Sequence, residues 1–133
     1  MSDWNTAIIE EFRANGGKVG GQFAGGNLLL LTTRGARTGN PHTTPLAYLA
    51  DGDRLVVTAS AAGAPRNPAW FHNVRANPTV EVELGTDTFK AVASIPDREE
   101  RDGLWEKVTS AMPGFADYQK QTDRVIPVVV LTR

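Results

Sequence analysis

The feature that most constrains the fold of this chain is a succession of short β-like segments separated by turn-forming residues. Strands are predicted over residues 28–33, 41–50, 54–59, 79–84, 88–95 and 125–132. Asp51-Gly52 indicates a hairpin between the second and third of these strands. Helices are predicted over residues 3–15, 67–76, 97–110 and 115–121. Because these helices do not alternate regularly with the strands, a mainly antiparallel α+β barrel of about six strands, with peripheral helices, fits better than a doubly wound parallel sheet.

Local signals mark the starts of two helices and the character of the last strand. Asn67 is expected to cap the second helix, with Pro68 at its first position. Asp97, followed three residues later by Glu100, resembles a capping box for the third helix. The last strand contains the uninterrupted apolar run 128–131, which predicts burial on both of its faces.

The N-terminal part of the chain is expected to be an appendage of the barrel. Apolar residues at helical spacing in 3–15 precede a glycine-rich stretch, so we assign 1–25 to a helix and arm and 26–133 to the barrel domain. The helix is expected to dock on the barrel or on a partner subunit. Peripheral membrane association is not expected, because the polar face carries Glu10 and Glu11 and lacks a lysine cluster.

The distribution of charge points to an anionic ligand. The formal net charge is −1, yet residues 12–50 contain no Asp or Glu, and only Asp51 and Asp53 appear before residue 80. The basic residues of the same half are Arg13, Lys18, Arg34, Arg37, Arg54, Arg66 and Arg75. A cleft lined by one sign of charge concentrates a ligand of the opposite sign. A small anionic molecule is therefore the expected partner, and nucleic acid is not.

Arg37-Thr38-Gly39, at a connection between two predicted strands, is one candidate for the anion site. A guanidinium and a hydroxyl suit phosphate or carboxylate oxygens, and glycine lets backbone N–H groups approach them. The segment is neither a Walker loop nor a Rossmann fingerprint. A β-turn with solvated arginines explains the tripeptide equally well.

The loop from Ser60 into the helix near Trp70 is the second candidate. N–H groups at a helix start bind anions or polar ring atoms, and Trp70 is suited either to wall an aromatic ligand or to join the core. His42 and His72 are the only histidines and the chain has no cysteine, so no metal site is predicted. Spacing alone leaves a Ser-His-Asp triad open, although no Gly-x-Ser-x-Gly elbow is present. Without a signal peptide or a membrane-spanning run, a cytoplasmic location is expected.

Motifs spread over 28–131 carry a family resemblance. They read Thr-Thr-x-Gly-x-x-Thr-Gly-x-Pro, Pro-Leu-x-Tyr-Leu, Asp-Gly, Ala-Ser-x-x-Gly, Asn-Pro-x-Trp-Phe-x-Asn-x-x-Ala-Asn-Pro and Tyr-Gln-x-x-Thr-Asp-Arg-x-Ile-Pro-Val-Val, in this order. The chain thereby resembles the deazaflavin-dependent nitroreductase family of actinobacteria. The resemblance implies a split β-barrel of the flavin-reductase type, with 26–133 as its cofactor-binding domain. It also implies binding of coenzyme F-420, an anionic 8-hydroxy-5-deazaflavin.

The resemblance also implies which residues contact the coenzyme. The phosphodiester region is expected at Ala36, Arg37 and Thr38. The second strand is expected to line the coenzyme with His42, Thr43, Thr44, Pro45, Leu46 and Ala47. The deazaflavin ring is expected against the backbone of Thr58, Ala59, Ser60 and Ala61. The helix start and the C-terminal turn are expected to contribute Ala69, Trp70, Phe71, His72, Asn73 and Phe115.

Two departures from the family pattern bear on affinity and substrate. Relatives often carry lysine at the position of Ala61, so Arg66 or Lys18 is the expected substitute. The nitroimidazole-activating relative has tyrosines where this chain has Met112 and Phe115, and only Tyr118 is kept. Quinones and activated enones are therefore expected as acceptors, besides nitroaromatics.

The implied reaction is hydride transfer from the reduced coenzyme to a small-molecule electron acceptor. Tyr118, Ser60 or solvent is expected to supply the accompanying proton. Two alternatives stay open at this point: an FMN-dependent reductase of the same fold, and a non-catalytic cofactor-binding protein. The sequence leaves the oligomeric state open as well.

Overall fold

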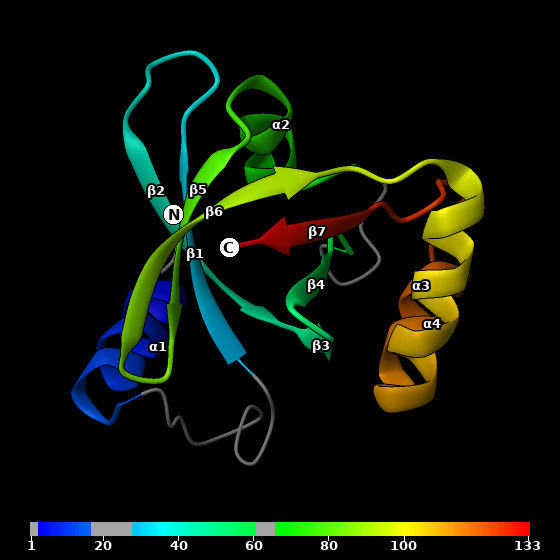
Figure 1. The fold of residues 1–133 in the computed structure, drawn as a ribbon, viewed down its shortest axis with the longest axis horizontal. Helices are drawn as coiled ribbons and strands as arrows, with labels where there is room; N and C mark the ends of the chain where they lie inside the picture. The colour runs from blue at the N-terminus through cyan, green and yellow to red at the C-terminus, as the bar shows by residue number, and fades with distance from the viewer. Residues whose placement is uncertain (1–2, 17–27, 61–65) are drawn as a thin grey trace.

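The computed structural model describes residues 3–16, 28–60 and 66–133. Within these ranges, seven strands form an antiparallel sheet in the order β2-β1-β5-β6-β7-β4-β3, flanked by four helices (Figure 1). The elements are α1 (Asp3–Ala14), β1 (Leu28–Arg34), β2 (Pro41–Ala47), β3 (Leu49–Asp51), β4 (Arg54–Thr58), α2 (Ala69–Ala76), β5 (Thr79–Leu84), β6 (Asp87–Ser94), α3 (Arg98–Ala111), α4 (Gly114–Lys120) and β7 (Val128–Thr132).

The sheet curls into a split barrel. β2 and β3 occupy its two opposite edges, yet only Tyr48 separates them along the chain. The two edges must therefore approach each other at Tyr48, although β2 and β3 do not pair. The predicted fold is confirmed, with one difference: the single strand expected over 41–50 is divided between the two edges, which makes seven strands rather than about six. The predicted Asp51-Gly52 hairpin joins β3 to β4, with Asp51 opposite Arg54.

The interior of the barrel is filled by alternate residues of the strands, as a period of two requires. Leu29 and Leu31 of β1 and Val129 and Leu131 of β7 are at most 1% exposed and belong to one apolar cluster. Helix α2 adds Trp70, Phe71 and Val74 to the same cluster. The helix is thereby fixed to the barrel interior.

The outer face of the sheet is covered at two places. Phe12 of α1 packs with Leu28 and Leu30 of β1. Burying a side chain of this size stabilises the fold by roughly 1.5–3 kcal/mol. Helix α3 covers Val128 and Val130 of β7. The predicted two-sided burial of the last strand is thus confirmed, and the first helix docks on the barrel. The proposed boundary at residue 25 lies outside the described residues.

Hydrogen bonding explains where the helix and strand boundaries differ from expectation. The prediction that Asn67 caps α2 is wrong: Pro68 is the N-cap residue, no side chain caps the helix, and Asn67 Oδ1 accepts a hydrogen bond from Arg124. Asp97 does cap α3, since its Oδ1 accepts from the Glu100 N–H at 2.9 Å. β7 begins at Val128 because the residue before it, Pro127, has no N–H to donate.

None of the helices in the described ranges is long and apolar enough to cross a membrane. The cytoplasmic location expected from the sequence stays a prediction.

Candidate active site

The turn that carries Arg37 and the helix start of the second candidate segment face each other across one cleft. The turn between β1 and β2 lies at the same end of the sheet as α2 (Figure 1), and the two enclose a cleft of about 450 Å³. The residues that line it are Gly35, Ala36, Arg37, Thr38, His42, Thr44, Ala69, Trp70, His72 and Asn73. Most of the residues predicted to contact the phosphodiester, or to contribute from the helix start, therefore line this cleft.

Asn73 fastens the turn to the helix. Its Oδ1 accepts a hydrogen bond from the Ala36 N–H at 3.0 Å, and its Nδ2 donates to Thr33 Oγ1 at 3.1 Å. Asn73 and Thr33 are 7% and 1% exposed, so neither group has water as a ready substitute. Asn73, predicted as a cofactor contact, thus also holds the cleft in shape, and Thr33 was not predicted at all.

The turn itself depends on glycine at Gly35. The Gly35 N–H donates to the Asn40 carbonyl at 2.8 Å, and the Gly35 carbonyl accepts from the Gly39 N–H at 2.9 Å. A Cβ atom at Gly35 would lie 2.9 Å from Thr38 Oγ1 and 3.2 Å from His42 Nε2. Because Gly35 has no side chain, two groups that are candidates for binding a ligand, the Thr38 hydroxyl and the His42 ring, can lie close to the backbone of the turn.

The cleft is lined by donors and by no acid. Among its described lining residues there is no Asp or Glu, while Arg37, Thr38, His42, His72 and the backbone of the turn supply N–H and O–H groups. The Arg37 side chain is exposed and has no hydrogen bond or ion pair with another described residue. Its guanidinium is therefore available to an anionic ligand, as it would also be in a solvated turn.

Strand alternation divides the residues predicted along β2. His42 and Thr44 line the cleft, while Leu46 packs against the interior cluster. Thr43 lies on the opposite face, where its Oγ1 is 2.8 Å from Thr32 Oγ1. Pro45 and Ala47 share the parity of Thr43, and Pro45 is buried. In α2, Phe71 belongs to the interior cluster alone, Trp70 belongs to that cluster and also lines the cleft, and Ala69, His72 and Asn73 line the cleft.

The end of β4 carries the residues predicted to hold the deazaflavin ring. Thr58, Ala59 and Ser60 are all less than 9% exposed, and Ala61 lies outside the described residues. Arg124 donates to the carbonyls of Ala59 and Ser60 at 3.0 and 2.8 Å. Burial lowers the pKa of Arg124 from its usual value. Sequence reasoning missed the role of Arg124, although it stands inside the last family motif.

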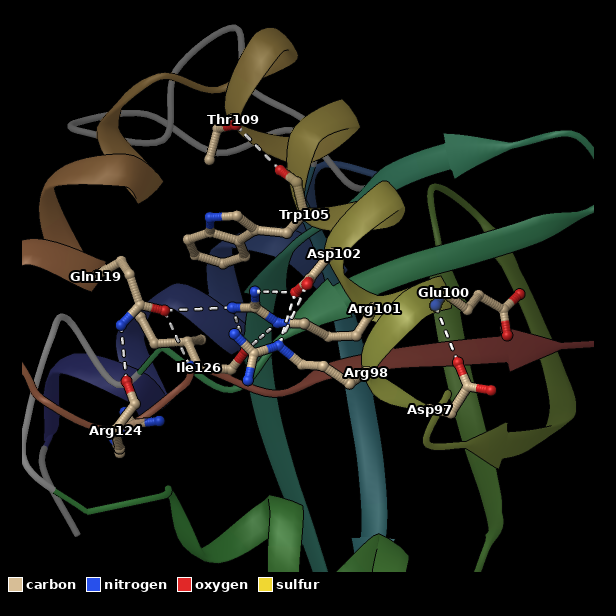
Figure 2. Close-up of polar contacts among 10 residues, drawn as sticks. All are labelled: Asp97, Arg98, Glu100, Arg101, Asp102, Trp105, Thr109, Gln119, Arg124 and Ile126. Carbon is tan, nitrogen blue, oxygen red and sulfur yellow. Dashed lines mark hydrogen bonds and ion pairs between the residues drawn. The ribbon is translucent and has the colours of Figure 1, made fainter.

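Phe115 and Tyr118 of α4 lie away from the cleft lining. Their rings meet edge to face with centroids 5.5 Å apart, and both side chains are half-buried. Phe115 packs against the cluster that contains Val56 and Val128 on the outer face of the sheet. Gln119, the next residue of α4, accepts from Arg101 of α3 and donates to the Arg124 carbonyl (Figure 2).

Comparison with known proteins decides the family. The family model described as F420H(2)-dependent quinone reductase matches residues 4–133. The chain belongs to this family. An F420H(2)-dependent quinone reductase of Mycobacterium tuberculosis is 41% identical over 126 residues, which cover 92% of this chain and 85% of that protein.

Solved structures agree with this assignment to the F420H(2)-dependent quinone reductases. A structure of an F420-H2 dependent reductase, FDR-A, is 37% identical with a TM-score of 0.72, covering 79% of this chain and 93% of that one. A structure described as a domain-swapped dimer is 34% identical with a TM-score of 0.74, covering 97% of both chains. The predicted deazaflavin-dependent reductase, its split barrel and coenzyme F-420 as its cofactor are thus confirmed. The FMN alternative gains no support.

The residues present suit a member of the F420H(2)-dependent quinone reductase family. The acid-free cleft offers charged and neutral donors to the anionic portion of the coenzyme. At the end of β4, the buried Thr58 Oγ1 has no hydrogen-bond partner among the described residues. A buried hydroxyl without a partner is unfavourable, and a ligand with polar ring atoms is one way to satisfy this part of the strand.

Proposed function

We propose that the cleft binds the anionic portion of coenzyme F-420, that the end of β4 holds the deazaflavin ring, and that the acceptor is a quinone. The observation that carries the proposal is the available Arg37 guanidinium in a cleft with no acid among its described lining residues. A planar guanidinium recognises phosphate or carboxylate oxygens through two parallel hydrogen bonds. The family membership supports the identity of the coenzyme.

Each wall of the cleft has a separate binding task. Arg37 and Thr38 bind the anionic groups, while Trp70 covers an apolar part of the ligand. His42 and Thr44 add donors from β2. The Ala59–Ser60 backbone, held by Arg124, presents polar main-chain groups to the ring. Trp70 and Ala59 belong to one apolar cluster, so the cleft and the ring seat are connected through packed side chains.

Reduced coenzyme F-420 supplies a hydride equivalent when bound. A quinone that receives a hydride equivalent also needs one proton to become a hydroquinone. The chain's task is to place the acceptor, to exclude water and to deliver that proton to the acceptor oxygen. Tyr118 Oη on α4 and Ser60 Oγ at the end of β4 are the two candidate donors, and Tyr118 is half-buried whereas Ser60 is 8% exposed.

The surroundings of Tyr118 support a quinone as the acceptor. Met112 and Phe115 make this part of the chain apolar, and both pack against the cluster over β4 and β7. The F420H(2)-dependent relatives of this chain are described as quinone reductases. We therefore expect menadione to be reduced with a higher kcat/KM than a bulky nitroimidazole.

Steady-state rates with the reduced coenzyme test this proposal. Oxidation of the coenzyme is followed by its visible absorbance, with menadione, an unsaturated lactone and a nitroimidazole as acceptors. A preference for menadione supports the proposal. If the chain binds the coenzyme but reduces none of the quinones tested, only the proposed role of the cleft in coenzyme binding would stand.

Self-association is part of the proposal. The domain-swapped dimer among the similar structures supports it, because that chain and this one cover each other almost completely. Light scattering coupled to size-exclusion chromatography distinguishes a dimer from a 14.3 kDa monomer.

A further inference from the structure

Arg124 donates hydrogen bonds to three acceptors that lie far from it in the sequence. Its guanidinium donates to the Ala59 and Ser60 carbonyls at the end of β4 and to Asn67 Oδ1 just before α2. The three distances are 3.0, 2.8 and 2.8 Å. A single planar side chain thus holds both the end of the ring-binding strand and the entry to the helix that walls the cleft.

The two carbonyl contacts also orient the backbone of the strand end. In a trans peptide the N–H points opposite to the C=O of the same unit. Because the Ala59 carbonyl faces Arg124, the Ser60 N–H faces the other way. No backbone acceptor among the described residues takes up this N–H. Arg124 therefore leaves a main-chain donor directed away from itself.

Gln119 of α4 holds the backbone on both sides of Val125. Its Nε2 donates to the Arg124 carbonyl at 2.7 Å, and its Oε1 accepts from the Ile126 N–H at 3.1 Å (Figure 2). The Arg124 backbone is thereby fixed to the residue that follows Tyr118 in α4.

Arg101 of α3 fixes Gln119 in turn. Its Nη2 donates to Gln119 Oε1 at 3.2 Å, and its Nε and Nη2 donate to the Ile126 carbonyl at 2.9 and 2.8 Å. The residue is only 8% exposed, and its guanidinium lies 4.7 Å from the centroid of the Trp105 ring. Such a buried and multiply bonded arginine has little freedom to move, so Gln119 keeps one orientation.

We propose that Arg101, Gln119 and Arg124 form a positioning network that sets the distance between the ring seat at the end of β4 and the acceptor wall on α4. The proposal rests on the proposed function, which places the deazaflavin ring at Ala59–Ser60 and the acceptor near Tyr118. In this proposal the three residues act through the backbone they hold and make no contact with the reacting atoms. Hydride transfer requires the reacting atoms at about 3–3.5 Å, and a displacement of about 1 Å costs on the order of 100-fold in rate.

Two conservative variants test the network. Arg124→Lys keeps the charge but lacks the planar fork that reaches two carbonyls. Gln119→Glu keeps the acceptor used by the Ile126 N–H and by Arg101, replaces the donor to the Arg124 carbonyl by an oxygen that repels it, and adds a negative charge beside Arg101. For both variants we expect kcat with menadione to fall about 10- to 100-fold. The dissociation constant of the oxidised coenzyme should change less than about threefold, because the anion contacts of the cleft supply most of the affinity.

The double variant and a surface control complete the experiment. The effects of residues that act as one unit are not additive. The kcat of the double variant, Arg124→Lys with Gln119→Glu, should therefore lie within about twofold of the kcat of the slower single variant. Lys120→Gln, at the position next to Gln119 on α4, replaces an exposed charged side chain that pairs with Asp117 at 3.9 Å, and should leave both constants unchanged. Thermal unfolding of each variant establishes that it is folded. If Arg124→Lys does not fold, the kcat of Gln119→Glu alone tests the network.

Separate outcomes reveal failure of the function and failure of the network. If the wild type binds the coenzyme but reduces no quinone, the proposed function is at fault. If the wild type turns over and both variants match its kcat, the network does not position the reaction. A parallel loss of kcat, coenzyme affinity and melting temperature would also overturn the inference, because it would show a general structural role.

Discussion

Removing the amide of Asn73 should both destabilise the fold and open the cleft. Asn73→Ala deletes the acceptor of the Ala36 N–H and the donor to the buried Thr33 hydroxyl. An unsatisfied buried polar group costs about 1–3 kcal/mol, and the partly exposed Ala36 N–H stands at the low end of this range. The expected loss is therefore about 2–4 kcal/mol of unfolding free energy. In a domain of this size that loss corresponds to ~6–20 °C in melting temperature.

Asn73→Asp separates the structural role from the charge of the cleft. A carboxylate can accept from the Ala36 N–H and from the Thr33 hydroxyl, but burying its charge costs free energy, so only part of the stability should be kept. The added negative charge lies in a cleft with no acid among its described lining residues, so binding of the anionic coenzyme should weaken by about tenfold or more.

Urea unfolding and a fluorescence titration with coenzyme F-420 measure the two effects. Asn77→Ala is the matched control, because the exposed Asn77 uses only its backbone N–H in its described hydrogen bond. If Asn73→Ala unfolds within about 0.5 kcal/mol of the wild type, as a surface substitution does, the bridge between turn and helix is not what holds the cleft.

Three further predictions address binding, catalysis and pH. Arg37→Ala should weaken coenzyme binding by about 2–4 kcal/mol, with Arg37→Lys restoring part of it; an unchanged dissociation constant would return Arg37 to the role of a solvated turn residue. Tyr118→Phe should lower kcat with menadione by about 10- to 1000-fold without changing coenzyme affinity, and a rate equal to that of the wild type would leave Ser60 or solvent as the proton source. The hydrogen bond from Arg101, followed by that from Arg98, lowers the pKa of Asp102 below its usual range. Its contribution to stability is present above the unfolded-state pKa and is lost as pH falls through the folded-state value, so the stability difference between wild type and Asp102→Asn should begin to shrink near about pH 4 and disappear only below the lowered folded-state pKa in acid-unfolding curves.

Local signals were sufficient to predict most of the fold. Turn residues such as Asp51-Gly52 interrupt β-like segments, and the absence of regular strand–helix alternation favours a barrel. The break at Tyr48 could not be predicted, because residues 41–50 are continuously compatible with a strand. The division between β2 and β3 arises from closure of the sheet, which depends on pairings distant in sequence.

The site was predicted less completely, for reasons that differ between its residues. The acid-free surroundings of Arg37 are visible in the sequence, and the structure places this residue in the cleft. Alternation along β2 would have separated His42 from Thr43 had the strand period been applied. The contacts of Arg124 could not be foreseen, because its partners Ala59 and Asn67 are 65 and 57 residues away along the chain.

The central claim is that an acid-free cleft at Arg37 selects the anionic deazaflavin coenzyme. Parallel titrations of the wild type and of Arg37→Ala with coenzyme F-420 and with FMN, monitored by tryptophan fluorescence, test it most directly. We predict a wild-type dissociation constant for coenzyme F-420 in the micromolar range or below, roughly 8 kcal/mol or more of binding free energy. FMN should bind distinctly more weakly, and Arg37→Ala should lose most of the preference. Equal affinity for the two cofactors, or tighter binding of FMN, would contradict the account.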